Sequence, residues 1–240
     1  MPMSVSRRDR PAKPALSREW IVAETIRIAQ AEGLGRATMR RVAQALDTGP
    51  ASLYVYVANT AELHAAVLDE LLAPVQVQLP GQGDWQVRLH RLLADYTAVL
   101  FAHPGLARSA LTIRSTGPNT LRLYDRVLGL LLEGGVEPGR ASWGVDLLLQ
   151  YATANAAEHS EPEPDAVDAP GDRAADWHAL TDAVRGADPQ KLPHLTAHAD
   201  PVLSGSPAQR IRWAVDALLA GISATATPPP TNRQQPPERT

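Results

Sequence analysis

The outward positions of the stretch from Pro50 to Tyr56 carry the side chains best suited to contact DNA. These side chains are small, hydroxylated or flat, and none is a carboxylate: Pro50, Ala51, Ser52, Tyr54, Val55 and Tyr56. Small residues at a helix start allow close approach to base edges, and Val55 could meet a thymine methyl group. The hydroxyls of Ser52 and Tyr54 can reach phosphates. The residue types therefore predict a surface for noncovalent contact with bases and backbone.

Two short helices joined by a tight turn must position this surface. Thr38 can accept a hydrogen bond from the first amides of a helix. That helix has apolar residues at helical spacing with polar residues facing outward: Met39, Val42, Ala43 and Leu46 against Arg40, Arg41 and Gln44. Residues 47–49 break the period, and Pro50 suits the first position of a second helix. Leu53 and Val57, four residues apart, supply its buried side.

Helix, short turn and helix form a helix-turn-helix unit, whose second helix enters the major groove of DNA. The same stretch is also compatible with a small helical pair in any all-α core, with the tyrosines half buried for packing. The flanks favour the DNA-binding interpretation. Before the unit, a helix capped by Ser17 and ended by Gly33 has the inner stripe Ile21, Thr25, Ile28 and Ala29. After it, residues 59–62 have the form of a capping box that opens a connecting helix with Leu63, Val67 and Leu71 inward.

Together these helices resemble the N-terminal DNA-binding domain of the TetR family of transcriptional regulators. The resemblance covers about residues 17–72. It rests on short motifs: Ile26 with Ala29, Glu32-Gly33-Leu34, Thr38-Met39-Arg40-Arg41-Val42-Ala43, Ser52-Leu53-Tyr54 with Tyr56-Val57, and Glu62-Leu63. Three positions depart from the family pattern: Asp47 replaces a turn glycine, Thr48 replaces an aliphatic residue, and Thr60 replaces a lysine that touches phosphate.

The resemblance implies a homodimeric repressor that is released from DNA by a small-molecule effector. Arg40 would contact a guanine or a phosphate. Bases would face Pro50, Ala51, Ser52 and Val55, and the DNA backbone would face Thr38, Tyr54, Tyr56 and, more weakly, Thr60. Two-fold symmetry predicts a palindromic double-stranded operator with half-site centres about 34–36 Å apart.

The charge distribution agrees with a DNA-binding segment on an acidic body. The net charge is -3, but residues 1–60 hold nine Lys or Arg against five Asp or Glu, and the remainder holds 14 against 21. Chance clustering of four basic residues within residues 1–15 explains part of this asymmetry. Without cysteine and without an apolar run of 18 residues, the chain is expected to be cytoplasmic, with no membrane association.

Helical apolar patterns separated by glycine and proline breaks predict an all-α fold in four segments. Residues 1–15 form a disordered basic arm, and residues 16–73 form the helix-turn-helix domain with its connecting helix. Residues 74–225 form a C-terminal helical bundle for ligand binding and dimerisation, and residues 226–240 form a disordered tail. Within the bundle, the predicted helices begin at Asp84, Leu106, Pro118, Pro138 and Pro207, and the acidic, proline-rich residues 158–176 form a loop.

The predicted inner faces of two bundle helices are given by their apolar spacing. From Pro118 the inward residues are Leu121, Tyr124, Val127, Leu128 and Leu131. From Pro138 the apolar residues are Trp143, Val145, Leu147, Leu148, Tyr151 and Ala152. This helix and the last one, from Pro207 to Ile222, carry small residues beside large aliphatic ones, so both are candidates for the interface between two protomers. The alternative is that these faces pack inside one protomer.

The resemblance also implies a small-molecule pocket inside the bundle. The candidate lining residues mix polar and aromatic side chains, as ligand cavities do. They are His103, Arg108, Thr112, Arg114, Tyr124, Trp143, Gln150, Tyr151 and Asn155. Trp143 and Tyr151, at helical spacing, are equally compatible with an ordinary core.

Catalytic and metal chemistry find little support in the sequence. His194 and His198 stand four residues apart and could share a metal, but they lie in a proline-broken segment without a matching carboxylate. The sequence lacks the motifs His-Glu-x-x-His, Gly-x-Ser-x-Gly, Gly-x-Gly-x-x-Gly and the phosphate loop. We therefore expect neither an enzyme nor a cofactor. The rival function is a helical ligand-binding or scaffold protein whose N-terminal domain no longer binds DNA.

Overall fold

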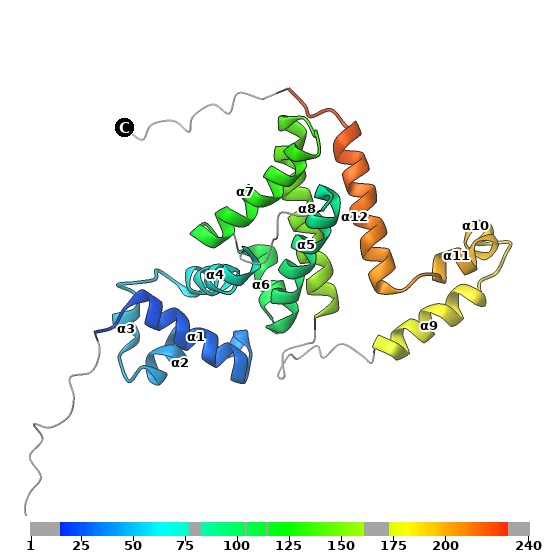
Figure 1. Ribbon diagram of the computed structural model, residues 1–240. Helices are drawn as coiled ribbons and strands as arrows, with labels where there is room; N and C mark the ends of the chain where they lie inside the picture. The colour runs from blue at the N-terminus through cyan, green and yellow to red at the C-terminus, as the bar shows by residue number, and fades with distance from the viewer. Residues whose placement is uncertain (1–14, 77–82, 104, 114, 161–172, 230–240) are drawn as a thin grey trace, which may run out of the picture.

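The computed structural model describes residues 15–76, 83–103, 105–113, 115–160 and 173–229, and in these ranges the only regular elements are helices. Figure 1 shows three groups of helices, which we call head, body and arm. The head contains α1 (Arg18–Glu32), α2 (Met39–Ala45), α3 (Pro50–Leu53) and α4 (Thr60–Leu71), with the short 3₁₀ helix Leu34–Arg36. The body contains α5 (Trp85–Ala102), α6 (Leu106–Thr112), α7 (Pro118–Glu133), α8 (Pro138–His159) and α12 (Pro207–Ala224). The arm contains α9 (Arg173–Arg185), α10 (Pro193–Ala197) and α11 (Ala199–Leu203). A second 3₁₀ helix, Ala73–Gln76, lies between α4 of the head and α5 of the body.

The helices of the head begin at the predicted caps. The side chains of Ser17, Thr38 and Asn59 accept hydrogen bonds from backbone amides three residues ahead, at 3.2, 3.2 and 2.9 Å. The expected capping box is modified, because the Glu62 carboxylate accepts from the amide of Ala58, at 2.7 Å, and not from that of Asn59. Each cap satisfies an amide that has no partner within its helix.

The turn between α2 and α3 contains the only non-glycine residue with positive φ in the described ranges, Asp47 at φ 49°. A short polar side chain tolerates this left-handed conformation better than most, which explains how the chain manages without the family's glycine. The turn also lets the amide of Thr48 donate to the carbonyl of Ala43, at 2.9 Å. This bond ties the turn to the last residues of α2.

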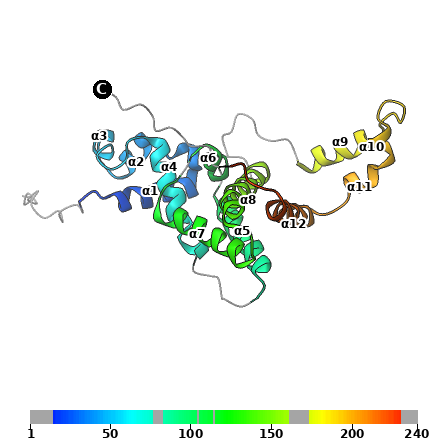
Figure 2. The same cartoon turned by 90° about the horizontal axis from the view of Figure 1, so that it is seen from above.

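In the body, α8 is the central helix and packs against α5, α6, α7 and α12 (Figures 1 and 2). The predicted starts at Asp84, Pro118, Pro138 and Pro207 are confirmed. The predicted inner face of α7 was partly wrong. Its buried apolar residues are Leu123, Val127, Leu130 and Leu131, whereas Leu121 is 59% exposed and Tyr124 39% exposed.

The arm, which lies between α8 and α12 in the chain, projects away from the body beyond α12 (Figure 2). Of the large apolar residues of α9, Val184 is buried, while Trp177 and Leu180 are exposed. The predicted N-terminal arm and C-terminal tail fall largely outside the described residues, as does most of the acidic loop. Within the described ranges, every helix is too short or too polar to cross a lipid bilayer.

Candidate DNA interface and ligand cavity

Helix α3 presents the predicted surface away from the protein interior. Leu53 and Val57 are 0% and 1% exposed, so both are anchored in the core of the head. The predicted second helix is shorter than expected: α3 ends at Leu53, and residues 54–56 form a turn after it. In this turn, on the side opposite the buried anchors, Tyr54 is 55% exposed and Val55 is 80% exposed. A large apolar side chain as exposed as Val55 is free to contact a partner. The buried anchors therefore fix which side of α3 faces outward.

Residues from α2 and the turn complete the same surface. Arg40 is exposed and lines a shallow depression together with Gln44, Asp47 and Pro50. Thr38 is also exposed, and its oxygen accepts from the amide of Arg41, which leaves the hydroxyl proton available to a phosphate. The structure thus places a guanidinium beside the start of α3 and leaves a hydroxyl exposed at the start of α2.

Arg41, next in sequence to Arg40, has a different role. Its guanidinium forms a two-pronged ion pair with Glu32 of α1, with Nη2 2.5 Å from Oε1 and Nε 3.1 Å from Oε2. This hydrogen-bonded pair holds the pKa of Glu32 below its usual value. The pair joins α1 to α2 and directs the Arg41 side chain toward α1.

Two of the predicted backbone-contacting residues are less exposed than the rest. Tyr56 is half-buried, and its hydroxyl donates to the carbonyl of Leu16, at 2.6 Å. Because a phenol has one proton, Tyr56 cannot donate to a phosphate while this bond is kept. The residue therefore ties the segment before α1 to the end of α3. Thr60, the first residue of α4, is also half-buried.

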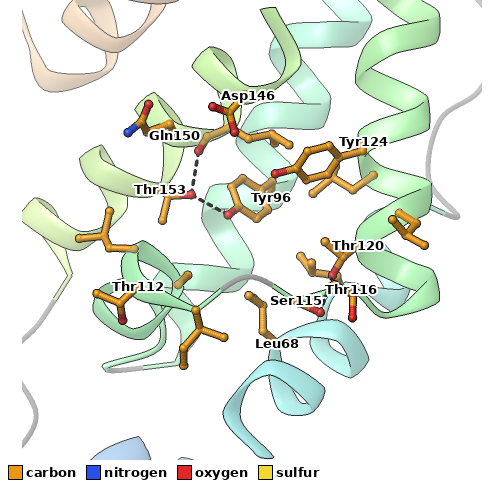
Figure 3. Close-up of a pocket in the computed structure, with 17 residues that line it drawn as sticks. Leu68, Tyr96, Thr112, Ser115, Thr116, Thr120, Tyr124, Asp146, Gln150 and Thr153 are labelled. Atoms are coloured by element: carbon orange, nitrogen blue, oxygen red, sulfur yellow. Dashed lines mark hydrogen bonds between the residues drawn. The ribbon is translucent and has the colours of Figure 1, made fainter. Parts of the chain in front are cut away.

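The body contains a cavity of about 360 Å³ lined by α4, α5, α6, α7 and α8 and by the connection before α7 (Figure 3). At its centre the hydroxyls of Tyr96 and Thr153 lie 2.7 Å apart. Thr153 donates to the carbonyl of Leu149, at 2.7 Å, so Tyr96 must be the donor to Thr153. Burial raises the pKa of Tyr96, which keeps it neutral. The cavity wall thus contains this hydrogen-bonded pair of hydroxyls among both apolar and polar side chains.

Three of the nine predicted ligand residues line this cavity: Thr112, Tyr124 and Gln150. Two others, Tyr151 and Asn155, line a separate groove of about 320 Å³ between α5, α8 and α12. His103, Arg108 and Trp143 line neither, and Arg114 lies outside the described residues. Trp143 is 61% exposed, because the faces of α8 that pack against the neighbouring helices carry Ala141, Gly144 and Val145 instead.

The sequence interpretation missed several polar lining residues. Asp146, Tyr96, Thr153, Thr120 and Ser115 all line the cavity. A signal existed for Tyr96 and Thr153, since a hydroxyl placed on the apolar stripe of a helix needs a buried partner. The pairing of these two residues, 57 positions apart, could not be read from spacing along one helix.

Comparison with known proteins places this architecture among transcriptional regulators. Residues 78–226 match the family described as "Tetracyclin repressor-like, C-terminal domain". The transcription regulator SCO7704 from Streptomyces coelicolor is 49% identical, with a TM-score of 0.73 over 91% of this chain and 100% of that one. ActR from Streptomyces coelicolor, solved in complex with actinorhodin, is 31% identical, with a TM-score of 0.74 over 87% of this chain and 96% of that one.

A curated relative carries a related description. The HTH-type transcriptional repressor DrrR1 from Streptomyces coeruleorubidus is 34% identical over 131 residues. That alignment covers 54% of this chain and 48% of DrrR1, so the match spans about half of the relative.

Proposed function

Because this chain belongs to the TetR family of transcriptional regulators, we propose that it is a homodimeric repressor that leaves its DNA operator when a small molecule occupies the body cavity. The observation that carries the proposal is the orientation of α3. Its leucine anchor is buried, and its carboxylate-free side is open to solvent next to Arg40. A helix end presented in this way can enter the major groove of DNA.

The proposed DNA contacts divide by chemistry. Ala51 and Val55, small or apolar and exposed, face the base edges together with Pro50 and Ser52. Thr38 and Tyr54 donate hydroxyl protons to phosphates, and Thr60 stays a weaker candidate. Arg40 reaches either a guanine or a phosphate, and the two possibilities predict different behaviour in binding assays.

The proposed dimer interface uses the exposed sides of α8 and α12. Trp143 and Leu147 form an exposed apolar pair one turn apart on α8, and Trp213 is 73% exposed on α12. Ala217 and Ala220 extend the α12 surface with small side chains. Other small residues of α8 lie inside the protomer, among them Ala152 and Ala156. Large apolar residues left in solvent on a monomer favour burial by a second copy.

The proposed effector acts through the connecting helix. Leu68 and Leu72, on α4 and just after it, contribute to the cavity wall, so an occupant touches the helix that carries the DNA-contacting unit. A tenfold loss of DNA affinity requires only about 1.4 kcal/mol of differential binding between two head positions. ActR has been solved with actinorhodin and with (S)-DNPA, and these two molecules are the first probes for this cavity.

The function is tested by selecting an operator and titrating salt. Genomic or random duplex fragments are selected with the full chain, and the dissociation constant of the selected site is measured over a range of salt concentrations. A repressor should enrich a palindrome, and log K should fall linearly with log salt, with a slope of about 0.9 per phosphate neutralised. A failure to enrich any palindrome, together with a flat salt dependence, would contradict the proposal.

Two single variants separate base contact from backbone contact. If Arg40 binds a guanine, Arg40→Ala should cost about 1–3 kcal/mol and relax the preference at one base pair. Tyr54→Phe, which removes only a hydroxyl, should weaken binding to selected and scrambled duplexes by the same factor. Competition assays with single-base operator variants distinguish the two patterns. If Arg40→Ala lowers affinity equally for every duplex, Arg40 contacts phosphate.

A further inference from the structure

A buried carboxylate joins the connecting helix of the head to the body. Asp69, near the end of α4, is 8% exposed and is the only acidic residue buried among those described. Burying a carboxylate is unfavourable unless hydrogen bonds compensate it. The partners of Asp69 lie about fifty positions later in the chain, at the first turn of α7.

Asp69 caps α7 from another helix. The N-cap position of α7 is Gly117, which has no side chain to accept from the first amides. Asp69 Oδ1 instead accepts from the amide and from the hydroxyl of Thr120, each at 2.8 Å, while Oδ2 accepts from Asn119 Nδ2 at 3.3 Å. An anionic acceptor at a helix N-terminus is also favoured by the helix dipole. The first turn of α7 therefore depends on a residue of α4.

Gly117 leaves the space that the Asp69 carboxylate occupies. Its backbone, at φ -73° and ψ 165°, is open to any residue, so conformation does not require glycine. Space does require it, since a Cβ at this position would lie 2.2 Å from Asp69 Cγ. The glycine lets α4 approach α7 closely enough for the carboxylate to reach the amide of Thr120.

The contact borders the cavity. Thr120 and Ser115 line the cavity, and their hydroxyl oxygens lie 2.9 Å apart (Figure 3). Leu68, which directly precedes Asp69 on α4, also lines the cavity. The hydroxyl of Thr120 is thus shared between the Asp69 contact and the cavity wall.

We propose that Asp69 is a positioning residue that holds the connecting helix, and with it the head, at a defined angle on the body. Operator binding depends on this because two heads must match the spacing of two half-sites, so this inference rests on the proposed function. Leu68 and Leu72, which line the cavity beside this contact, have apolar side chains, and burial of apolar surface is nondirectional. By contrast, the Asp69 carboxylate accepts three hydrogen bonds from α7, and because hydrogen bonds are directional they set the angle of α4 on the body.

The test separates the capping of α7 from the link between the helices. Asp69→Ala removes both, whereas Asp69→Ala with Gly117→Ser gives α7 a cap of its own in the space vacated by the carboxylate. We expect Asp69→Ala to lower the melting temperature and the double variant to regain most of the loss. Both variants should bind the selected operator at least tenfold more weakly than the parent.

A distance measurement makes the test independent of DNA. The chain has no cysteine, so spin labels can be placed through Ala31→Cys in α1 and Ala98→Cys in α5, both exposed positions. Labelled chains are diluted with unlabelled protein, so that the measured distance lies within one protomer. We expect one narrow distribution for the parent and a broad one for both Asp69 variants, the recapped variant included.

Two results would overturn the inference. If the recapped variant shows the narrow parental distribution, Asp69 only stabilises α7. If it has a broad distribution but parental operator affinity, head position does not govern binding. Should Asp69→Ala alone fail to fold, the recapped variant still decides between these outcomes. A parent that binds no operator but shows the predicted change in distance refutes the proposed function and leaves the link in place.

Discussion

Replacing Val55 with Glu is expected to reduce operator affinity at least about a hundredfold while leaving the melting temperature unchanged. Val55 is 80% exposed, so a polar side chain there costs the folded protein little. In a DNA groove the new carboxylate would face phosphates, and like charges brought together at an interface cost several kcal/mol. The measurement is a fluorescence-anisotropy titration of the selected operator, paired with thermal unfolding of the same preparation.

Val55→Gln is the matched control for this variant. Glutamine has the size and shape of glutamate without its charge, so any loss that both variants share comes from the valine methyl groups. We expect Gln to lose a few-fold in affinity and mainly at sites with a thymine opposite Val55. Equal affinities for the Glu and Gln variants would show that α3 does not enter the groove.

The sequence predicted where the helices of the head and body begin, because the causes of a helix start are local. Ser17, Thr38 and Asp84 cap their helices as expected. Ser206 forms a full capping box with Gln209, and Pro207 stands at the first position of α12. A cap acts over three residues, so one short window contains all the information. The outward face of α3 was predictable for the same reason, since Leu53 and Val57 lie one turn apart.

The face that α7 buries was harder to predict because its sequence is apolar on more than one side. Leucines at 121, 123, 128, 130 and 131 permit two overlapping stripes, and both have helical spacing. The choice is made by the neighbours of α7, among them Asp69, which draws Asn119 and Thr120 inward. Burial of those two polar residues turns Leu123 to the core and leaves Leu121 outside.

The lining of the cavity was also hard to predict, because it depends on which helices become neighbours. Its polar centre joins Tyr96 of α5 to Thr153 of α8, and its wall includes Leu68 of α4. Thr112, Tyr124 and Gln150 were predicted as polar or aromatic residues near the middle helices, and they line the cavity. Trp143 was predicted with them but is exposed; an aromatic residue on a helix gives no sign of which neighbour it will face. Residues brought together from distant helices are fixed by packing, which a single sequence does not display.

Truncating Leu53 to Ala is expected to produce the largest loss of stability among the variants considered. Leu53 is 0% exposed and is the one buried residue within α3, a four-residue helix with no side-chain cap. So short a helix cannot persist without tertiary packing. Removing a buried leucine side chain down to Cβ typically costs about 2–5 kcal/mol. Urea unfolding followed by circular dichroism should show this loss, and the folded fraction should bind the operator poorly because α3 is no longer held.

Leu121→Ala is the comparison variant for this experiment, because it makes the same chemical change at a leucine that is 59% exposed on α7. Its cost should stay below about 1 kcal/mol, as expected for a surface position. The two variants also differ in place, since one lies in the head and the other beside the cavity. If Leu53→Ala unfolds at the parental urea concentration and still binds the operator, the packing of Leu53 does not fix α3. In that event the orientation of the whole DNA-facing surface would need another cause, and Tyr56, bonded to the Leu16 carbonyl, is the next residue to change.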